Sequence, residues 1–409
     1  MRRDLDALLR ARGLAAAVVV KGELPNATFR YLLGPPAADM TTAIVIWRPG
    51  EKPFLVHASM ERDAAARTGF ERADYGALEY RKILEREGNP EAAMARLLER
   101  LFDRLGISGR ILMTGVLDLA SSYPMMNLLR EYRPSIEFAR DEDPGLFALA
   151  RLSKDADEIE AIRAAGRACA RAYERVRATI AGGRIRGGEL GDAEGPITIG
   201  RLRRGIRRVF FEAGLEEPHG NIVAMGRDAA VPHNSGNDEE VVVEGKAITI
   251  DLYPVQAGGG YYFDVTRTIC AGRAPAELKE IHGIVREALD LSIGSLHVGA
   301  PARSYQEKVC DLFEARGHRT IRQDPCLEEG YVHGLGHGIG LEVHERPYLG
   351  GSATNKDRIE PGSVFTIEPG LYYPSRGIGV RLEDVVLVHP DGRVENLTDV
   401  PYELEIAPA

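Results

Sequence analysis

Two regions of the sequence place single acidic residues inside runs of apolar residues. In the first, Asp251 lies in AITIDLYPV and Asp264 follows 13 positions later in YYFDVTRTI. In the second, Glu368 lies in VFTIEPGLYY and Glu383 follows 15 positions later in GVRLEDVVLV. A carboxylate in such a run is costly to bury unless it is paired, hydrogen-bonded or bound to a cation. The pattern therefore predicts a buried site for divalent metal ions.

The elements that must position these acids are two similar units of strand, turn and strand. Facing antiparallel strands bring residues on the two strands close together. Two such hairpins related by a pseudo-twofold axis would bring all four carboxylates to one point, where they would raise one another's pKa. Divalent cations reverse that effect, and carboxylate and imidazole ligands without thiolate favour Mn, Co, Fe or Zn.

A histidine ligand is expected from the segment HGLGHGIGLEVHERP (333–347), which contains three of the ten histidines. His333 and His337 have the spacing of an H-E-x-x-H zinc site, but Gly334 replaces the required glutamate and the segment is too rich in glycine for a helix. The glycines also fail to fit G-x-G-x-x-G, so a dinucleotide site is rejected.

Four segments resemble the signature motifs of the pita-bread metallopeptidases, a family that includes methionine aminopeptidases, aminopeptidase P, prolidases and the metal-free creatinases. They are DVTRT (264–268), GHGIGLEVHE (336–345), TIEPGLYY (366–373) and GVRLEDVV (379–386). The resemblance implies that residues 151–409 form an α+β pita-bread domain with a pseudo-twofold repeat and a curved antiparallel sheet.

The resemblance also implies two divalent ions, with manganese favoured and cobalt, zinc or iron as alternatives. One ion would be held by Asp251, Asp264 and Glu383, and the other by Asp264, His337, Glu368 and Glu383. Because creatinase-like members have lost this set, its retention argues against creatine hydrolysis.

A metal-activated water is the nucleophile implied by the family. By the same resemblance, Glu368 would carry a proton to the leaving nitrogen, His344 would contact the substrate carbonyl or intermediate, and His233 would lie over the metals. His333 and Tyr372 would line a proline pocket. Arg381 and Thr266 would hold the ligand carboxylates in place. Six histidines match no motif and are expected to be surface or satisfied residues: His57, His219, His282, His297, His318 and His389.

Two positions depart from the family pattern. The family has D-x-G on the first strand, whereas this chain has Asp251-Leu-Tyr-Pro254 and a longer turn before Asp264. Prolidases carry an arginine after H-E-x-P, whereas Tyr348 follows His344-Glu-Arg-Pro347 here. This weakens a strict dipeptidase interpretation, although Arg346 or another basic residue could substitute.

Residues 1–150 are predicted to form a separate α/β domain, which resembles the creatinase-like N-terminal domain in size and α/β alternation. By that resemblance, its presence favours the Xaa-Pro branch over methionine aminopeptidases. Helical periodicity is seen at 2–12, 60–68, 91–105 and 118–131, and β-rich runs at 16–20, 43–47, 53–57, 111–115 and 136–140. After the boundary, a helix capped by Ser153 runs to about residue 180, and further helices are expected at 275–293 and 303–316. The glycine-rich segment 182–196 is expected to be an exposed connection or flap.

The composition of the chain argues against several classes of binding partner. A net charge of -9 disfavours nucleic acid and anionic lipid, and the arginines at 201, 203, 204, 207 and 208 fit the solvated face of an amphipathic helix. Four cysteines without a C-x-x-C pair, no signal peptide and no apolar span indicate a cytoplasmic protein without membrane segments. A homodimer is expected by analogy.

The function favoured by these residues is hydrolysis of the bond before proline in peptides, as an Xaa-Pro dipeptidase or aminopeptidase. One alternative is a pita-bread enzyme acting on a non-peptide, such as a lyase or an amidinohydrolase-like enzyme, because fold does not fix function. Another is a binding protein that has lost catalysis, which the intact ligand set disfavours.

Overall fold

The computed structural model describes residues 4–409. The chain folds into two compact units, Met1–Arg151 and Leu152–Ala409. None of the helices in the described part of the chain is both long and apolar enough to cross a bilayer.

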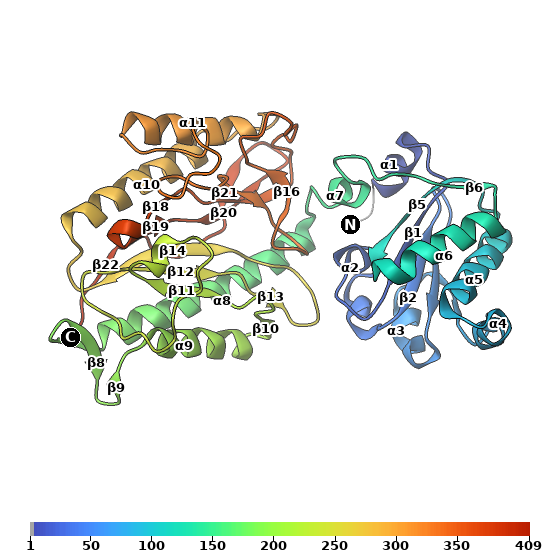
Figure 1. The fold of residues 1–409 in the computed structure, drawn as a ribbon, viewed down its shortest axis with the longest axis horizontal. Helices are drawn as coiled ribbons and strands as arrows, with labels where there is room; N and C mark the ends of the chain where they lie inside the picture. The colour runs from blue at the N-terminus through green and yellow to red at the C-terminus, as the bar shows by residue number, and fades with distance from the viewer. Residues whose placement is uncertain (1–3) are drawn as a thin grey trace. The chain divides into compact units, whose positions relative to one another are not determined.

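The first unit is built on a six-stranded mixed sheet (Figure 1). Its strands in spatial order are β4 (Glu71–Asp74), β3 (Phe54–His57), β2 (Ala43–Trp47), β1 (Ala16–Lys21), β5 (Gly109–Val116) and β6 (Ile136–Phe138). Strand β2 is antiparallel to both of its neighbours, whereas β5 is parallel to β1 and β6. The helices are α1 (Leu5–Ala11), α2 (Ala27–Leu33), α3 (Arg62–Arg67), α4 (Tyr80–Glu87), α5 (Pro90–Leu105), α6 (Leu119–Tyr132) and α7 (Leu146–Ala150).

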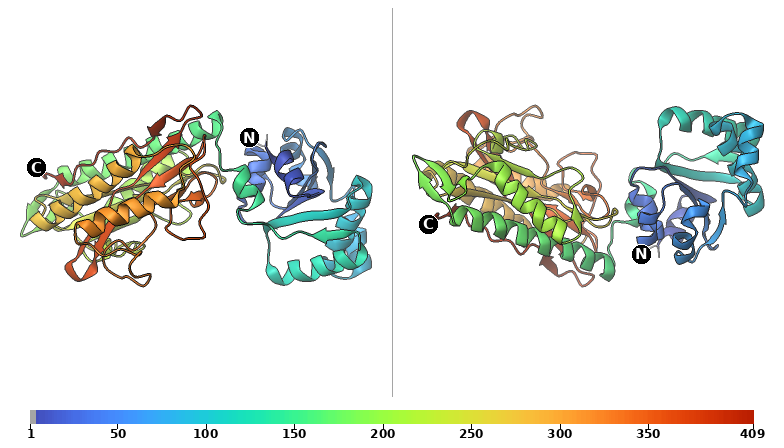
Figure 2. Two further views of the ribbon diagram at one scale, coloured as in Figure 1. Left: turned by 90° about the horizontal axis from the view of Figure 1, so that it is seen from above. Right: turned by 90° about the horizontal axis from the view of Figure 1, so that it is seen from below.

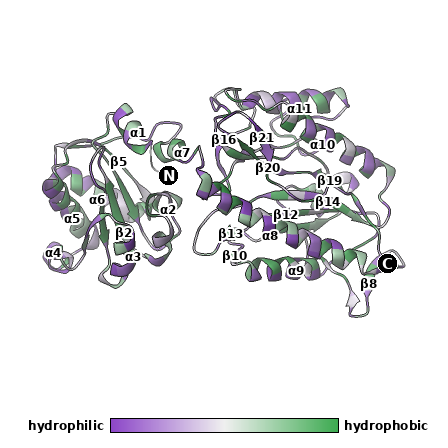
Figure 3. Cartoon of the chain, turned by 180° about the vertical axis from the view of Figure 1, so that it is seen from behind, coloured by the Kyte–Doolittle hydropathy of each residue, from purple (hydrophilic) through white to green (hydrophobic). Residues whose placement is uncertain are grey.

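The sequence pattern of each segment explains most of the helices and strands of this unit. Strands β1 and β2 are continuous apolar runs because both faces of the sheet are covered, and Figure 3 shows the hydrophobic strands. Helix α5 begins with Pro90 at its first turn and with the Asn89 side chain accepting from Ala92 N. The expected α/β class and all nine expected elements are confirmed, except that residues 2 and 3 of the first expected helix lie outside the described part of the chain. Helices α2, α4 and α7 and strand β4 were not foreseen.

The second unit places its strands between two pairs of helices (Figures 1 and 2). Helices α8 (Ala156–Ala181) and α9 (Ile199–Glu212) lie on one side, and α10 (Ala276–Gly294) and α11 (Arg303–Ala315) on the other. The three expected helices are present, but Ser153 does not cap α8. Asp155 does so instead, in a reciprocal capping box with Glu158, while Ser153 Oγ donates to Pro361 O at 3.0 Å.

Helix α9 is amphipathic, as expected, with one exception on its charged face. Leu202, Ile206 and Phe210 are buried. Arg203 is also buried, where it donates to Asp238 and to the carbonyl of Ser235, so it is a structural residue. An arginine can turn inward here because partners on a distant loop accept hydrogen bonds from both of its terminal nitrogens.

Two main sheets form the centre of the second unit. One has the order β11 (Ile222–Met225), β12 (Ala247–Leu252), β14 (Val265–Ala271) and β22 (Glu405–Ile406); the other has the order β16 (Glu345–Tyr348), β15 (His337–Gly338), β17 (Val364–Ile367), β20 (Asp384–Val388) and β21 (Val394–Asn396). All neighbours are antiparallel except β14 and β22. The two expected hairpins are therefore present as β12 with β14 and β17 with β20.

Three small ribbons complete the second unit. They are β18 (Gly370–Tyr373) with β19 (Ile378–Arg381), β10 (Leu215–Glu216) with β13 (Val255–Gln256), and β7 (Arg184–Arg186) with β8 (Glu189–Asp192) and β9 (Gly195–Pro196). The last of these is the glycine-rich segment, expected to be an exposed connection or flap, which forms a small antiparallel sheet.

Candidate metal centre

The first hairpin brings two acids to one end of its strand pair. Asp251 lies in β12, opposite Thr266 of β14, and Asp264 immediately precedes β14. Both aspartates are buried. Their proximity follows from the register, because the chain turns back over residues 253–263 and returns Asp264 next to Asp251.

The second hairpin repeats this arrangement. Ile367 pairs with Asp384, so the acids one position further out, Glu368 and Glu383, face each other where the ladder of β17 and β20 ends. Glu383 is buried and Glu368 is partly exposed. All four carboxylates predicted from the sequence thus lie at the ends of the two central strand pairs.

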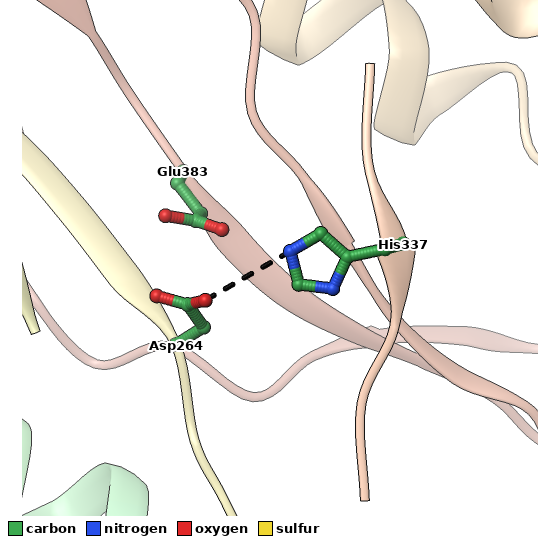
Figure 4. Close-up of side chains that lie close together, drawn as sticks. All are labelled: Asp264, His337 and Glu383. Carbon is green, nitrogen blue, oxygen red and sulfur yellow. Dashed lines mark ion pairs between the residues drawn. The ribbon is translucent and has the colours of Figure 1, made fainter. Parts of the chain in front are cut away.

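His337 enters this cluster from the short strand β15. Its Nδ1 lies 3.1 Å from Gly338 O, which leaves Nε2 facing the acids, at 3.4 Å from Glu368 Oε1 and 3.9 Å from Asp264 Oδ2. Ligand atoms of Asp264, His337 and Glu383 all lie within 4.8 Å of one another (Figure 4). This approach needs Gly336, because a Cβ there would lie 2.0 Å from Thr366 O.

The electrostatics of the cluster call for added positive charge. Burial, reinforced by the neighbouring carboxylates, raises the pKa of Asp264 and of Glu383 well above the usual values. Burial also raises the pKa of Glu368 to about 7. Among the described residues, the buried atoms Asp251 Oδ1 and Asp264 Oδ1 have no hydrogen-bond partner. Divalent cations would supply the missing interactions, so the residues present fit the ions that the family resemblance implies.

A network of buried hydrogen bonds and an ion pair connects the candidate ligand residues. Thr266 Oγ1 donates to Glu383 Oε2 at 2.7 Å. Arg381 binds Asp251 Oδ2 at 2.5 Å through Nη2, donates to Thr266 Oγ1 at 3.1 Å through Nε, and donates to Tyr372 Oη at 2.9 Å through Nη1. These contacts fix the carboxylate orientations before any ion binds.

A pocket of about 560 Å³ lies over the cluster. It is lined by nine of the eleven site residues predicted from the sequence: His233, Asp251, Asp264, His333, His337, His344, Glu368, Arg381 and Glu383. The other two, Thr266 and Tyr372, are fully buried behind the wall. Tyr372 Oη lies 2.8 Å from His333 Nε2, so Tyr372 orients His333 and does not itself form the pocket surface.

The structure adds His219 to the pocket wall, a residue that sequence analysis assigned to the surface or to satisfied histidines. It is exposed and lies three positions before Ile222, which pairs with Asp251. No motif marks His219. His219 is brought to the pocket by the pairing of β11 with β12, and a single sequence does not reveal that pairing.

The structure also shows how the segment after His344 is arranged. Tyr348 lines the pocket and is 42% exposed. Arg346, the residue considered as a substitute for the missing arginine, binds Asp357 at 2.5 Å and is absent from the described pocket lining. An aromatic side chain therefore forms this point of the wall.

Comparison with known proteins places this site in a family. The model of metallopeptidase family M24 matches residues 160–390. The probable dipeptidase PepE of Mycobacterium bovis is 28% identical over 100% of this chain and 98% of its own length. The Xaa-Pro dipeptidase of Pyrococcus furiosus is 30% identical over 74% of this chain and 75% of its own length.

Solved structures share the fold. The crystal structure of a dipeptidase from Pyrococcus horikoshii superposes with a TM-score of 0.75 at 23% identity, covering 99% of both chains. The Xaa-Pro dipeptidase from Bacillus anthracis also gives 0.75, at 24% identity and 98% coverage of both chains. These similarities confirm the expected fold class, including its pita-bread unit. Because the family model matches more than half of the chain, the chain belongs to metallopeptidase family M24 and is a metal-dependent peptidase.

Proposed function

We propose that this protein hydrolyses the peptide bond before proline in peptides, as an Xaa-Pro dipeptidase or an Xaa-Pro aminopeptidase. The observation that carries the proposal is the convergence of Asp251, Asp264, His337, Glu368 and Glu383 on one pocket. The names of its relatives support Xaa-Pro bonds as the target, since the Pyrococcus furiosus relative is an Xaa-Pro dipeptidase.

The five candidate ligands divide between two ions. Asp251, Asp264 and Glu383 would hold one, and Asp264, His337, Glu368 and Glu383 would hold the other, so that Asp264 and Glu383 would serve both. When bound, the ions would lower the pKa of a water from about 15.7 toward about 7 and polarise the scissile carbonyl. Manganese is the proposed metal, because a carboxylate and imidazole set without thiolate suits it, with cobalt, zinc and iron as alternatives.

The residues around the ions supply binding and proton transfer. Glu368 lines the pocket, where it would carry a proton to the leaving nitrogen. His344 and His233 line the pocket wall. His344 would contact the substrate carbonyl or the tetrahedral intermediate, and His233 would lie over the metals. His333, held by Tyr372, forms the wall for the proline ring. Arg381 and Thr266 keep the carboxylates in place.

Two further properties belong to the proposal. The four cysteines are free thiols, three of them buried, which supports a reducing cytoplasmic location. A homodimer is proposed from the family resemblance, and sedimentation of the purified protein tests it.

The decisive experiment is an activity screen of the metal-loaded protein. Ala-Pro and Ala-Pro-Ala are incubated with Mn, Co or Zn, and released alanine is measured, with Ala-Ala as the control peptide and Asp264→Asn as the control variant. We expect cleavage of at least one proline peptide and none by the variant. If neither proline peptide releases alanine with any metal, the proposal is wrong. The ratio of the two rates separates dipeptidase from aminopeptidase action.

A further inference from the structure

A fully buried ion pair lies beside the pocket without forming part of its surface. Lys154 Nζ binds Glu345 Oε2 at 3.0 Å, and the two side chains are 2% and 4% exposed. Lys154 comes from the segment before α8, and its backbone N–H donates to Gly362 O at 2.8 Å. Neither residue belongs to the described lining of the pocket.

The second oxygen of Glu345 organises a loop. Its Oε1 accepts from Leu341 N at 2.9 Å and from Glu342 N at 3.1 Å. Gly340 packs against the same carboxylate, because a Cβ there would lie 2.7 Å from Oε2. Glu345 also pairs with Gly338 across β15 and β16, which closes the loop at its base. Residues 339–344 are therefore folded around one carboxylate.

His344 is the last residue of this loop. Its ring centroid lies 4.3 Å from that of His337, with an interplanar angle of 78°. The position of His344 relative to the metal cluster therefore depends on how residues 339–344 are held. A shift of about 1 Å in such a group can reduce a catalytic rate about 100-fold.

We propose that Lys154 and Glu345 form a positioning pair that fixes His344 over the metal centre. The two backbone N–H groups and the ammonium satisfy the buried carboxylate, and the ammonium cancels its charge. Removing one partner leaves a buried charge uncompensated, which loosens the loop, whereas removing both charges leaves a neutral side chain that can still accept from Leu341 and Glu342. The inference rests on the proposed function only for the role of His344.

The first test needs no substrate. Hydrogen exchange is followed by mass spectrometry in Lys154→Met, Glu345→Gln and the double variant, with peptides covering 339–345. The matched control is Lys279→Met, which removes the same side chain from an exposed pair with Glu405. We expect exchange of 339–345 to be about tenfold faster in Lys154→Met and close to wild type in the double variant and the control. Peptides from α10 report global unfolding and are expected to be unchanged.

The second test separates a positioning role from general support of the fold. In Lys154→Met we expect kcat for the best proline peptide to fall about tenfold, with KM and Mn affinity changed less than about threefold. In a His344→Ala background, Lys154→Met should reduce kcat little further, because the imidazole that Lys154 helps to position is already absent.

Two results would overturn the proposal: unchanged exchange of 339–345 in Lys154→Met, or an equal loss of kcat in both backgrounds. If the wild type cleaves no proline peptide, the proposed function fails, and the exchange experiment alone then decides whether the pair holds the loop.

Discussion

Arg381 shows how one residue can prepare a metal site. Its guanidinium contacts Asp251, Thr266 and Tyr372 at once, and Thr266 in turn binds Glu383. A planar guanidinium presents several donors in a fixed geometry, which the single ammonium of lysine does not reproduce. Arg381 therefore orients carboxylates on both hairpins while balancing part of their charge.

Arg381→Lys is expected to weaken divalent metal binding by about 10- to 100-fold, because it keeps the charge but loses the geometry that fixes the ligands. Calorimetric titration of the metal-free protein with Mn measures this. The control is Arg376→Lys, at an exposed arginine paired with Glu277, which should bind Mn like the wild type. Equal affinities of the two variants would show that Arg381 has no part in holding the ligands.

At the scale of elements, the two hairpins are joined by a second buried arginine. Arg267 of β14 is 1% exposed and binds Asp384 of β20 at 2.8 Å. It also donates to the carbonyls of Glu383 at 2.7 Å and of Val400 at 2.8 Å. One side chain thus connects both strand pairs that carry the candidate ligands to the C-terminal segment.

Arg267→Met is expected to lower the free energy of unfolding of the second unit by about 3–5 kcal/mol, because it leaves buried carbonyls and a buried carboxylate without their donor. Urea unfolding of the metal-free protein measures the change. In the control Arg316→Met, the lost pair with Glu287 is about half exposed, so the cost should stay below about 1 kcal/mol. A loss no larger than in the control would contradict the cross-linking role.

At the scale of the molecule, the metal cluster and its pocket lie wholly within Leu152–Ala409. A ligand that binds only the folded state stabilises the unit to which it binds. Metal loading should therefore affect the two compact units differently.

Adding Mn at about 100 times its Kd should stabilise the second unit by about 2.7 kcal/mol. Hydrogen exchange with and without chelator measures this unit by unit. We expect slower exchange in β12, β14, β17 and β20 with metal bound, and no change in β1 and β2. Equal protection of both sets of strands would mean that the units do not respond independently.

Local pattern alone predicted much of this protein. Apolar runs interrupted by Asp251 and Glu368 identified the strands that carry the candidate ligands, because an acid in a buried strand needs a partner wherever the chain folds. Helix and strand periodicity gave nine elements of the first unit and three long helices of the second, since these depend on neighbours in sequence. Ser153 was the wrong cap for α8 because several nearby polar residues could serve, and only the backbone geometry selects Asp155.

What required the tertiary structure depends on interactions between distant segments. His219 reaches the pocket only through the register of β11 against β12, and Tyr372 lies behind the wall because Arg381 and His333 hold it there. Lys154 and Glu345 are 191 positions apart. Periodicity and motif spacing describe short stretches of chain, so they cannot show which buried charges meet once the sheets are assembled.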